Sequence, residues 1–385
     1  GEMHAKKIEK LYSMAMKMGA PIVALVDCAG FRLQESMDAL DGFGKLYVCQ
    51  AMASGVIPQI QAVFGNCGGG MAVASVIAEN DADNSSAEYQ AKETGNVCAT
   101  GSEKEIFTEI RNLVSILPAN NEDDMSYSEC EDDLNRICTD IENCAGDTSI
   151  ALSMISDDSF YMEMKKDYAP EMVTAFIRLN GATVGCVANR SEVYTDGEKT
   201  ATYDAALTAA GCEKAAAFVN FCNAFEIPVL TLVNVDGYKN CKCNEKKIAK
   251  AAARLTYAFA NADVPKVTVV VGKANGTAGL TMNSKSIGSD IVYAWKNAKI
   301  GVMEAAPAVK IMYADEIAKA DNAAALINEK AAQYNEMQAS ALAAAKRGYV
   351  DDIIEASETR QRVVAAFEML FTKREDRPSK KHGTI

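Results

Sequence analysis

Short, uninterrupted apolar runs alternate along the chain with longer segments in which apolar residues recur at helical spacing. Four apolar runs stand at residues 22–26, 59–64, 229–233 and 266–271. Their β-branched, unbroken character is typical of strands that are buried on both faces. Helical periodicity precedes or separates the runs at residues 6–17, 39–53, 214–224 and 247–260. Strands that alternate with helices predict an α/β fold with mainly parallel strand pairing.

This order of elements occurs twice at a constant spacing. Pro21 aligns with Pro228, and Gly65 aligns with Gly272, in both cases at an offset of 207 residues. Each copy has a glycine-rich turn after its second apolar run, followed by a helix of small residues. Chance matches would not keep one offset over such a length, so the sequence predicts an internal duplication of one structural unit.

An acidic segment separates the two copies. Residues 118–147 contain ten acidic residues and one basic residue, Arg136. The charge and the absence of a long apolar pattern predict a solvated linker, and a specific docking surface is the alternative. We therefore expect two domains, 1–147 and 148–385. Two long helices are predicted in the second domain, at residues 315–347 and 355–371.

Charge and composition exclude several classes of function. The chain has 39 basic and 52 acidic residues, and its net charge of −13 argues against nucleic-acid binding. The two histidines, His4 and His382, stand near the two ends, so histidine-based triads and histidine-rich metal sites are not expected. Twelve cysteines without a C-x-x-C pair predict mostly buried thiols in a reducing cytoplasm.

The two glycine-rich turns are the candidate chemical sites. Gly68, Gly69 and Gly70 follow the strand of the first copy, and Gly276 with Thr277 and Ala278 follows that of the second. A turn between a strand and a helix leaves backbone N–H groups free to bind a phosphate or to stabilise an oxyanion. Neither turn has the spacing of a P-loop or of a dinucleotide-binding G-x-G-x-x-G motif. Close packing of helix on strand is the simpler explanation of such glycines, but the duplication favours a site.

Several segments together resemble one enzyme family. Residues 27–35 read DCAGFRLQE, which resembles the D-S-G-G-A-R-[IL]-Q-E segment of acyl-CoA carboxyltransferase β subunits. The turn that begins at Gly65, the segment that begins at Lys266, and residues 348–360 are similar to further motifs of that family. The resemblance covers the chain from end to end. It implies two tandem crotonase-like domains, with acyl-CoA held by residues 1–147 and carboxybiotin by residues 148–385.

The resemblance also implies roles for individual residues. Gly69 and Gly70 would donate N–H groups to the enolate oxygen of the thioester, and Thr277 and Ala278 would donate to the ureido oxygen of biotin. Residues implied to contact cofactor or substrate are Arg32, Gln34, Gly68, Gly276 and Leu280. For Arg32 a surface salt bridge is the simpler explanation, and for Leu280 a place in the core. No metal ion is implied.

The implied reaction moves a carboxyl group between carboxybiotin and the α-carbon of a short-chain acyl-CoA. The main alternative is the α subunit of a biotin-dependent acyl-CoA decarboxylase sodium pump that acts on glutaconyl- or methylmalonyl-CoA. An enoyl-CoA hydratase or isomerase and a non-catalytic subunit are further alternatives. The implied partners are a biotin carboxyl carrier protein, a biotin carboxylase or membrane decarboxylase subunit, and further copies of the chain, as a dimer or a trimer of dimers.

Three departures from the family pattern stand out. Thr277 replaces a glycine, Gly279 replaces a tyrosine, and Glu304 replaces the usual glycine after Met303. A threonine at a position that needs positive φ would be strained, so the sequence leaves the conformation of the second turn open. Residues 79–87 are also shorter than the corresponding stretch of the family.

Overall fold

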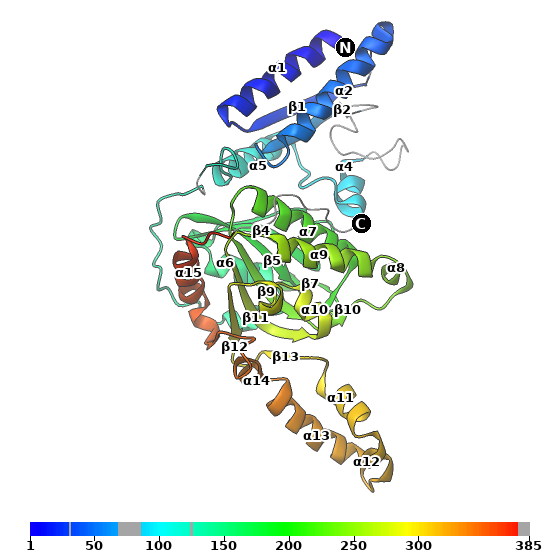
Figure 1. Cartoon of the computed structure of the whole chain (residues 1–385), viewed down its shortest axis with the longest axis vertical. Coiled ribbons are helices and arrows are strands. Elements are labelled where there is room, and N and C mark those ends of the chain that lie inside the picture. The colour runs from blue at the N-terminus through cyan, green and yellow to red at the C-terminus, as the bar shows by residue number, and fades with distance from the viewer. Residues whose placement is uncertain (31, 68–85, 124–125, 376–385) are drawn as a thin grey trace. The chain divides into compact units, whose positions relative to one another are not determined.

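The computed structural model describes residues 1–30, 32–67, 86–123 and 126–375 (Figure 1). Contacts divide the chain into two compact units. The first unit comprises residues 1–128 with the short segments 165–168 and 224–226, and the second comprises residues 129–164, 169–223 and 227–385. The contacts thus change within the acidic segment, after Ser128, rather than at its end.

The first unit is built on two parallel strands, β1 (Ile22–Cys28) and β2 (Gln59–Cys67). Helices α1 (Glu2–Met18) and α2 (Ser36–Ala53) flank them in sequence, and α5 (Glu103–Ile116) follows. The core of this unit contains Tyr12, Leu46, Ala53 and Ile57. On α1, the residues in this core recur at helical spacing, which gives the helix one apolar stripe.

The prediction that the strand at 22–26 is buried on both faces is wrong. Val23 and Leu25, alternate residues of β1, are 41% and 55% exposed. The physical reason is that, among the residues that the structure describes, β1 pairs only with β2, whereas its counterpart β9 (Val229–Val235) lies inside a larger sheet. Leu230 and Leu232 of β9 are at most 1% exposed.

An eight-stranded mixed sheet forms the centre of the second unit. Its strands run in the order β14-β12-β11-β9-β5-β4-β3, and β13 also pairs with β11. The pairs from β5 to β14 are parallel, while β3, β4 and β5 are antiparallel. Besides β9, the strands are β3 (Tyr161–Glu163), β4 (Met172–Leu179), β5 (Ala182–Asn189), β11 (Lys266–Asn275), β12 (Ile291–Trp295), β13 (Lys299–Gly301) and β14 (Asp352–Ile354).

Helices cover both faces of this sheet. Helices α6 (Thr148–Ile155) and α15 (Thr359–Leu370) share one buried cluster with Leu230 and Leu232 of β9. On the opposite face, α7 (Ala209–Ala224) packs through Phe218, whose ring lies 5.0 Å from that of Phe176 on β4. Helix α9 (Ile248–Asn261) lies beside α7 in Figure 1. The central strands are therefore apolar on both faces, as their sequence predicts.

The strand pairs of the two units have the same register. Ile22 pairs with Gln59 on β1 and β2, and Val229 pairs with Lys266 on β9 and β11. Each residue of the first pair therefore lies 207 positions before its counterpart in the second pair. The register also shifts at equivalent places in the two units. After the shift, Cys28 pairs with Cys67 in the first unit, and Val235 pairs with Ala274 in the second.

The irregularity in each pair is held by one polar side chain. Asp27 accepts a hydrogen bond at 2.9 Å from the N–H of Asn66, and Asn234 accepts one at 3.1 Å from the N–H of Lys273. The residue before each donating N–H is a glycine. A Cβ atom at Gly65 would overlap the side chain of Asp27, and a Cβ atom at Gly272 would overlap that of Asn234. The equivalent glycines thus leave space for equivalent polar contacts.

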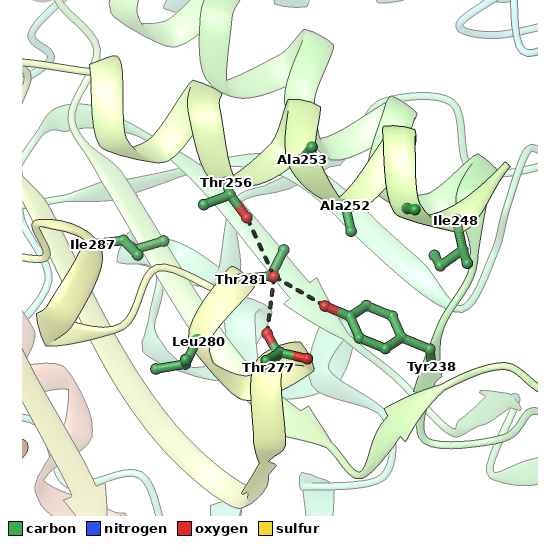
Figure 2. Close-up of a pocket in the computed structure, with 10 residues that line it drawn as sticks. Tyr238, Ile248, Ala252, Ala253, Thr256, Thr277, Leu280, Thr281 and Ile287 are labelled. Carbon is green, nitrogen blue, oxygen red and sulfur yellow. Dashed lines mark hydrogen bonds between the residues drawn. The ribbon is translucent and has the colours of Figure 1, made fainter. Parts of the chain in front are cut away.

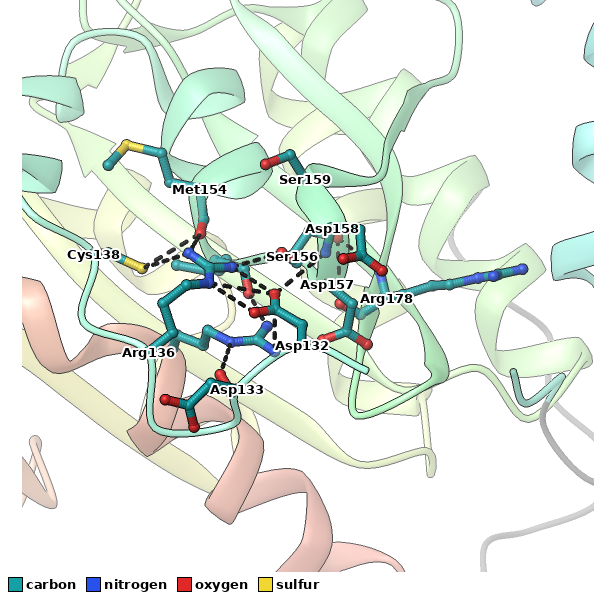
Figure 3. A network of polar contacts seen from close by, with 12 residues as sticks. Asp132, Asp133, Arg136, Cys138, Met154, Ser156, Asp157, Asp158, Ser159 and Arg178 are labelled. Carbon is teal, nitrogen blue, oxygen red and sulfur yellow. Dashed lines mark hydrogen bonds and ion pairs between the residues drawn. The ribbon is translucent and has the colours of Figure 1, made fainter. Parts of the chain in front are cut away.

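The acidic segment is not a solvated linker throughout. Cys138 and Ile141 are buried, and Arg136 donates hydrogen bonds to Asp132 and to two backbone carbonyls (Figure 3). The fully buried guanidinium of Arg360 adds contacts to the same segment. Residues 129–147 are therefore a packed part of the second unit.

Three helices replace the single helix predicted from residue 315 to residue 347. They are α12 (Ala314–Lys319), α13 (Ala323–Gln338) and α14 (Ala341–Ala345), and a further helix, α11 (Ala305–Met312), precedes them. The alanine-rich composition concealed two helix starts, at which Asn322 and Ser340 accept N–H groups of the following turn. The second predicted helix, at 355–371, is present as α15 after a short 3₁₀ turn.

All twelve cysteines are free thiols, and the prediction that most are buried is wrong. The buried ones are Cys138, Cys186, Cys212 and Cys222, while Cys98 and Cys243 are exposed and the other six are half-buried. None of the described helices combines the length and the apolar content that a membrane span requires.

Candidate functional site

The second glycine-rich turn joins β11 to a short helix, α10 (Gly276–Thr281). Gly276 has a φ of +58°, and a Cβ there would lie 3.0 Å from the carbonyl oxygen of Val302. A Cβ at Gly279 would lie 2.7 Å from the carbonyl carbon of Ala274. The left-handed conformation therefore falls on Gly276 rather than on Thr277. Threonine at position 277 consequently brings no left-handed backbone strain to the turn.

The first turn of α10 presents backbone N–H groups that the helix cannot satisfy itself. Asn275 is the N-cap, but its side chain makes no capping hydrogen bond. Its amide donates instead to Asp236, at 2.6 Å. Thr277 is exposed and Ala278 is 1% exposed, so the two successive N–H groups lie at the boundary between solvent and core. Such a pair can donate to an oxygen that gains negative charge.

A cluster of ion pairs holds the end of β11, from which this turn starts. Lys273, three residues before the turn, contacts Asp236 at 2.7 Å and Glu304 at 2.5 Å. Burial raises the pKa of Asp236, but the hydrogen bonds from Lys273 and Asn275 outweigh it, and the net pKa lies below the usual value. Glu304, which departs from the family pattern, therefore has a structural partner in Lys273.

A pocket of about 520 Å³ opens beside α10 (Figure 2). The hydroxyl of Thr281 donates to the carbonyl of Thr277 at 2.9 Å, and it lies 3.3 Å from the hydroxyls of both Tyr238 and Thr256. Leu280 lines the pocket and is 45% exposed, so it is not a core leucine. The lining residues are Tyr238, Ile248, Ala249, Ala252, Ala253, Thr256, Thr277, Leu280, Thr281 and Ile287.

Sequence reasoning missed three polar residues of this pocket, Tyr238, Thr256 and Thr281. A signal existed for each. Tyr238 aligns with Phe31 in the repeat, and Thr281 lies only four residues after Thr277. On α9, small residues recur at helical spacing up to Thr256, which leaves one face of the helix open to a ligand.

The structure brings four of the predicted residues together, namely Gly276, Thr277, Ala278 and Leu280. Gly68, Gly69 and Gly70 lie outside the described residues. Arg32 forms a local ion pair with Glu35 at 3.0 Å, and the side chain of Arg32 is 65% exposed. Gln34 is also exposed, one residue before Glu35.

Comparison with known proteins identifies the family. The profile of a family described as the carboxyl transferase domain matches residues 1–80 and 79–385. The chain belongs to this family. The two matched segments meet at residues 79–80, where the sequence was expected to be shorter than the family pattern. The predicted resemblance to acyl-CoA carboxyltransferases is therefore confirmed.

Relatives and solved structures agree with this assignment. The methylmalonyl-CoA decarboxylase subunit alpha of Propionigenium modestum is 37% identical over the whole chain and 80% of its own length. The propionyl-CoA carboxylase carboxyltransferase subunit of Haloferax mediterranei is 35% identical, with the same coverage. The crystal structure of transcarboxylase 12S with methylmalonyl-coenzyme A and methylmalonic acid bound superposes with a TM-score of 0.91. It is 33% identical, and the match covers all of this chain and 79% of that one. The predicted α/β carboxyltransferase fold is thereby confirmed.

Proposed function

We propose that this carboxyltransferase moves a carboxyl group between carboxybiotin and the α-carbon of a short-chain acyl-CoA. The first unit would hold the acyl-CoA, and the second unit, which contains α10, would hold biotin. The observation that carries the proposal is the uncapped start of α10, which presents the N–H groups of Thr277 and Ala278 beside an apolar pocket. Relatives named as carboxylase subunits and relatives named as decarboxylase subunits are both similar to the whole of this chain, so the proposal leaves the direction of transfer open.

We also infer a tandem duplication of one crotonase-like unit. The equal registers of β1–β2 and β9–β11 support it, as do the equivalent contacts of Asp27 and Asn234 with their neighbouring strands. Two unrelated units would have no reason to share a register shift and the glycine that accommodates it. On this inference each copy holds one carbonyl substrate.

The pocket beside α10 suits biotin in size and polarity. Its walls are alanine, leucine, isoleucine, threonine and tyrosine side chains, which fit a compact bicyclic ring with a polar ureido edge. When bound, carboxybiotin supplies the carboxyl group and a ureido nitrogen that is basic once the carboxyl group has left. Thr277 and Ala278 would hold the ureido oxygen through their N–H groups, and Leu280 would flank the ring.

The first copy would complete the reaction. Gly69 and Gly70 are proposed to donate N–H groups to the thioester oxygen, and Arg32 and Gln34 to approach the phosphates of CoA, with Gly68 shaping the turn. Stabilisation of the enolate oxygen lowers the barrier to deprotonation of the α-carbon. This scheme assigns no role to His4 or His382.

The proposed partners follow from the reaction and the relatives. Biotin would arrive on a biotin carboxyl carrier protein, with a biotin carboxylase or a membrane decarboxylase subunit in the same complex. Several relatives are named as subunits, and the solved transcarboxylase 12S is described as a hexamer assembly. We therefore propose a homo-oligomer, either a dimer or a trimer of dimers.

The substitution Thr277→Pro tests the proposed oxyanion donor. Proline removes the N–H but is compatible with the first turn of a helix. We expect transfer from methylmalonyl-CoA to free biotin to fall about 10²- to 10³-fold, the usual loss for one oxyanion donor. Thr277→Ala is the matched control, because it removes the hydroxyl and keeps the N–H.

The rate of carboxyl transfer is measured by steady-state kinetics in which both substrates are varied. Malonyl-CoA and glutaconyl-CoA serve as further carboxyl donors. The fluorescence of Trp295, the single tryptophan, confirms that the second unit is folded. A folded Thr277→Pro variant with transfer as fast as that of Thr277→Ala would show that the turn is only structural.

A further inference from the structure

A cluster of lysines borders the biotin-side pocket, and none of the roles proposed so far uses it. Residues 239–250 contain one acidic residue, Glu245, and five lysines, in a chain whose net charge is −13. These lysines, here called the basic rim, are Lys239, Lys242, Lys246, Lys247 and Lys250. All five are exposed.

The basic rim is continuous in sequence with the wall of the pocket. Tyr238, which lines the pocket, directly precedes the rim, and the rim continues through α8 (Lys242–Glu245) into the first turn of α9. Ile248 and Ala249, which lie between two rim lysines in sequence, line the same pocket. The pocket lining and the positive charge are therefore carried by the same segment, residues 238–250.

Most of this positive charge is not neutralised by acidic residues in the part of the chain that the structure describes. Lys239 approaches Asp204 at 3.8 Å, but both side chains are exposed, so this contact contributes little. A second charged pair near α9, between Arg254 and Glu213 at 3.4 Å, does not involve a rim lysine. Residues 239–250 thus have a net charge of about +4, whereas the whole chain has a net charge of −13.

We propose that the basic rim is the docking surface for an acidic face of the protein that carries biotin. This inference rests on the proposed function, because it takes the α10 pocket to be the biotin site. Complementary charge accelerates encounter and orients the partner, while adding little to the strength of the final complex. The lysines would thereby direct the tethered biotin toward the pocket that they border.

The form of the cluster favours a protein surface over the phosphates of a nucleotide. The five lysines are spread over a loop, a short helix and the start of α9, and Glu245 lies among them. Lysine is a strongly hydrated point charge on a flexible stem, whereas dedicated phosphate sites favour the planar fork of arginine or clustered backbone N–H groups. The rim contains no arginine.

Biotinylated peptides separate these possibilities. Three biotin acceptors are compared, namely free biotin, biotinyl-lysine in a glycine–serine peptide, and biotinyl-lysine flanked by aspartates. At low salt we expect the KM for the acidic peptide to be about tenfold below that for the neutral one. The difference should vanish at about 0.5 M salt, where screening is strong. It should also vanish in the Lys242→Glu/Lys246→Glu variant, whose kinetics with free biotin should stay unchanged.

The matched control is Lys310→Glu/Lys319→Glu, which changes the charge equally at two exposed lysines of α11 and α12. It should retain the preference for the acidic peptide. Equal KM values for the two peptides in the unaltered protein would overturn the proposal. A rise in the KM for acyl-CoA on reversal of the rim charges would overturn it as well, because the rim would then serve CoA phosphates.

Failure of the proposed function is recognised separately. If the unaltered protein transfers no carboxyl group to free biotin, the carboxyltransferase mechanism fails, whatever the rim does. Fluorescence anisotropy with labelled peptides still tests the rim in that case, because it needs no turnover. Binding of the acidic peptide that is no tighter than that of the neutral peptide would then overturn the docking proposal.

Discussion

Replacement of Arg360 by methionine should strongly destabilise the second unit. The Arg360 side chain is fully buried on α15, and its guanidinium donates to Asp157 at 2.7 Å, to the carbonyl of Ile155 at 2.6 Å and to that of Asp133 at 3.2 Å. Methionine fills a similar volume but leaves a buried carboxylate and two carbonyls without this donor. Removing one partner of a buried ion pair costs about 3–5 kcal/mol.

The magnitude can be expressed as a melting temperature. For a unit of this size, 1 kcal/mol corresponds to about 2–4 °C, so the expected loss is roughly 6–20 °C. Part of the carboxylate is still satisfied, because Asp157 also accepts from the N–H groups of Asn180 and Gly181. We therefore expect about 4 kcal/mol rather than a complete failure to fold.

The control and the reporter both lie close to the perturbed residue. Arg362, two residues along α15, is exposed and contacts Asp352 at 3.5 Å and Glu358 at 3.6 Å, so Arg362→Met should cost at most about 1 kcal/mol. Trp295 donates a hydrogen bond to Thr359 at 2.9 Å, which makes its fluorescence a local probe of denaturant-induced unfolding. If Arg360→Met and Arg362→Met lost the same small amount of stability, our interpretation of the buried network would be refuted.

Two further predictions concern a carboxylate and a glycine. The hydrogen bond from Arg136, together with the charge of Arg360, holds the pKa of Asp132 below its usual value, so this stabilisation is present above about pH 4 and is lost as pH falls further. Asp132→Asn should therefore lower stability at neutral pH and flatten the acid-unfolding profile, whereas an unchanged profile would contradict this cause. Gly272→Ala should lower the free energy of unfolding by about 1–3 kcal/mol, because the new Cβ overlaps the side chain of Asn234. The double variant Gly272→Ala/Asn234→Ala should recover part of this loss, as measured by denaturant unfolding.

The paired strands were predictable because their signal is local and repeated. Apolar runs of strand length, each preceded by proline and followed by glycine, mark β1, β2, β9 and β11 without any knowledge of packing. The constant offset then predicts which strands correspond. It could not show why Gly272 is glycine, since the cause is the side chain of Asn234 on a neighbouring strand.

Other features depend on contacts that a local pattern does not contain. The acidic composition of residues 118–147 predicted solvation, but Asp132 meets Arg360, more than two hundred residues away in sequence. The prediction that β1 is buried failed because burial depends on how many strands and helices cover it. The β4–β5 hairpin did carry a usable signal, the Asn180-Gly181 pair, whose two positive φ angles suit a tight turn.

In the candidate site, too, some residues could be predicted from local sequence and others depend on tertiary contacts. The turn at Gly276–Ala278 could be found from glycine, spacing and family resemblance, because these residues are adjacent in sequence. Tyr238 and Thr256 left only weak signals in the repeat and in the spacing of small residues. Their contact with Thr281 could not be predicted, since it forms only when β10 (Gly237–Tyr238), α9 and α10 pack together. Chemistry that resides in one turn is visible in a sequence, and chemistry that is assembled from several elements is not.

The exposed side chains of β1 imply that the two copies of one strand pair differ in cooperativity. A two-stranded sheet is marginal by itself, and Val23 and Leu25 gain little from burial within their own unit. The equivalent pair, β9 and β11, is locked between neighbours on both sides and can open only with the whole sheet. Backbone amides in β1 should therefore exchange with solvent through local openings of low free energy, while those of β9 report global unfolding. We therefore expect duplicated geometry to behave as one rigid half and one compliant half.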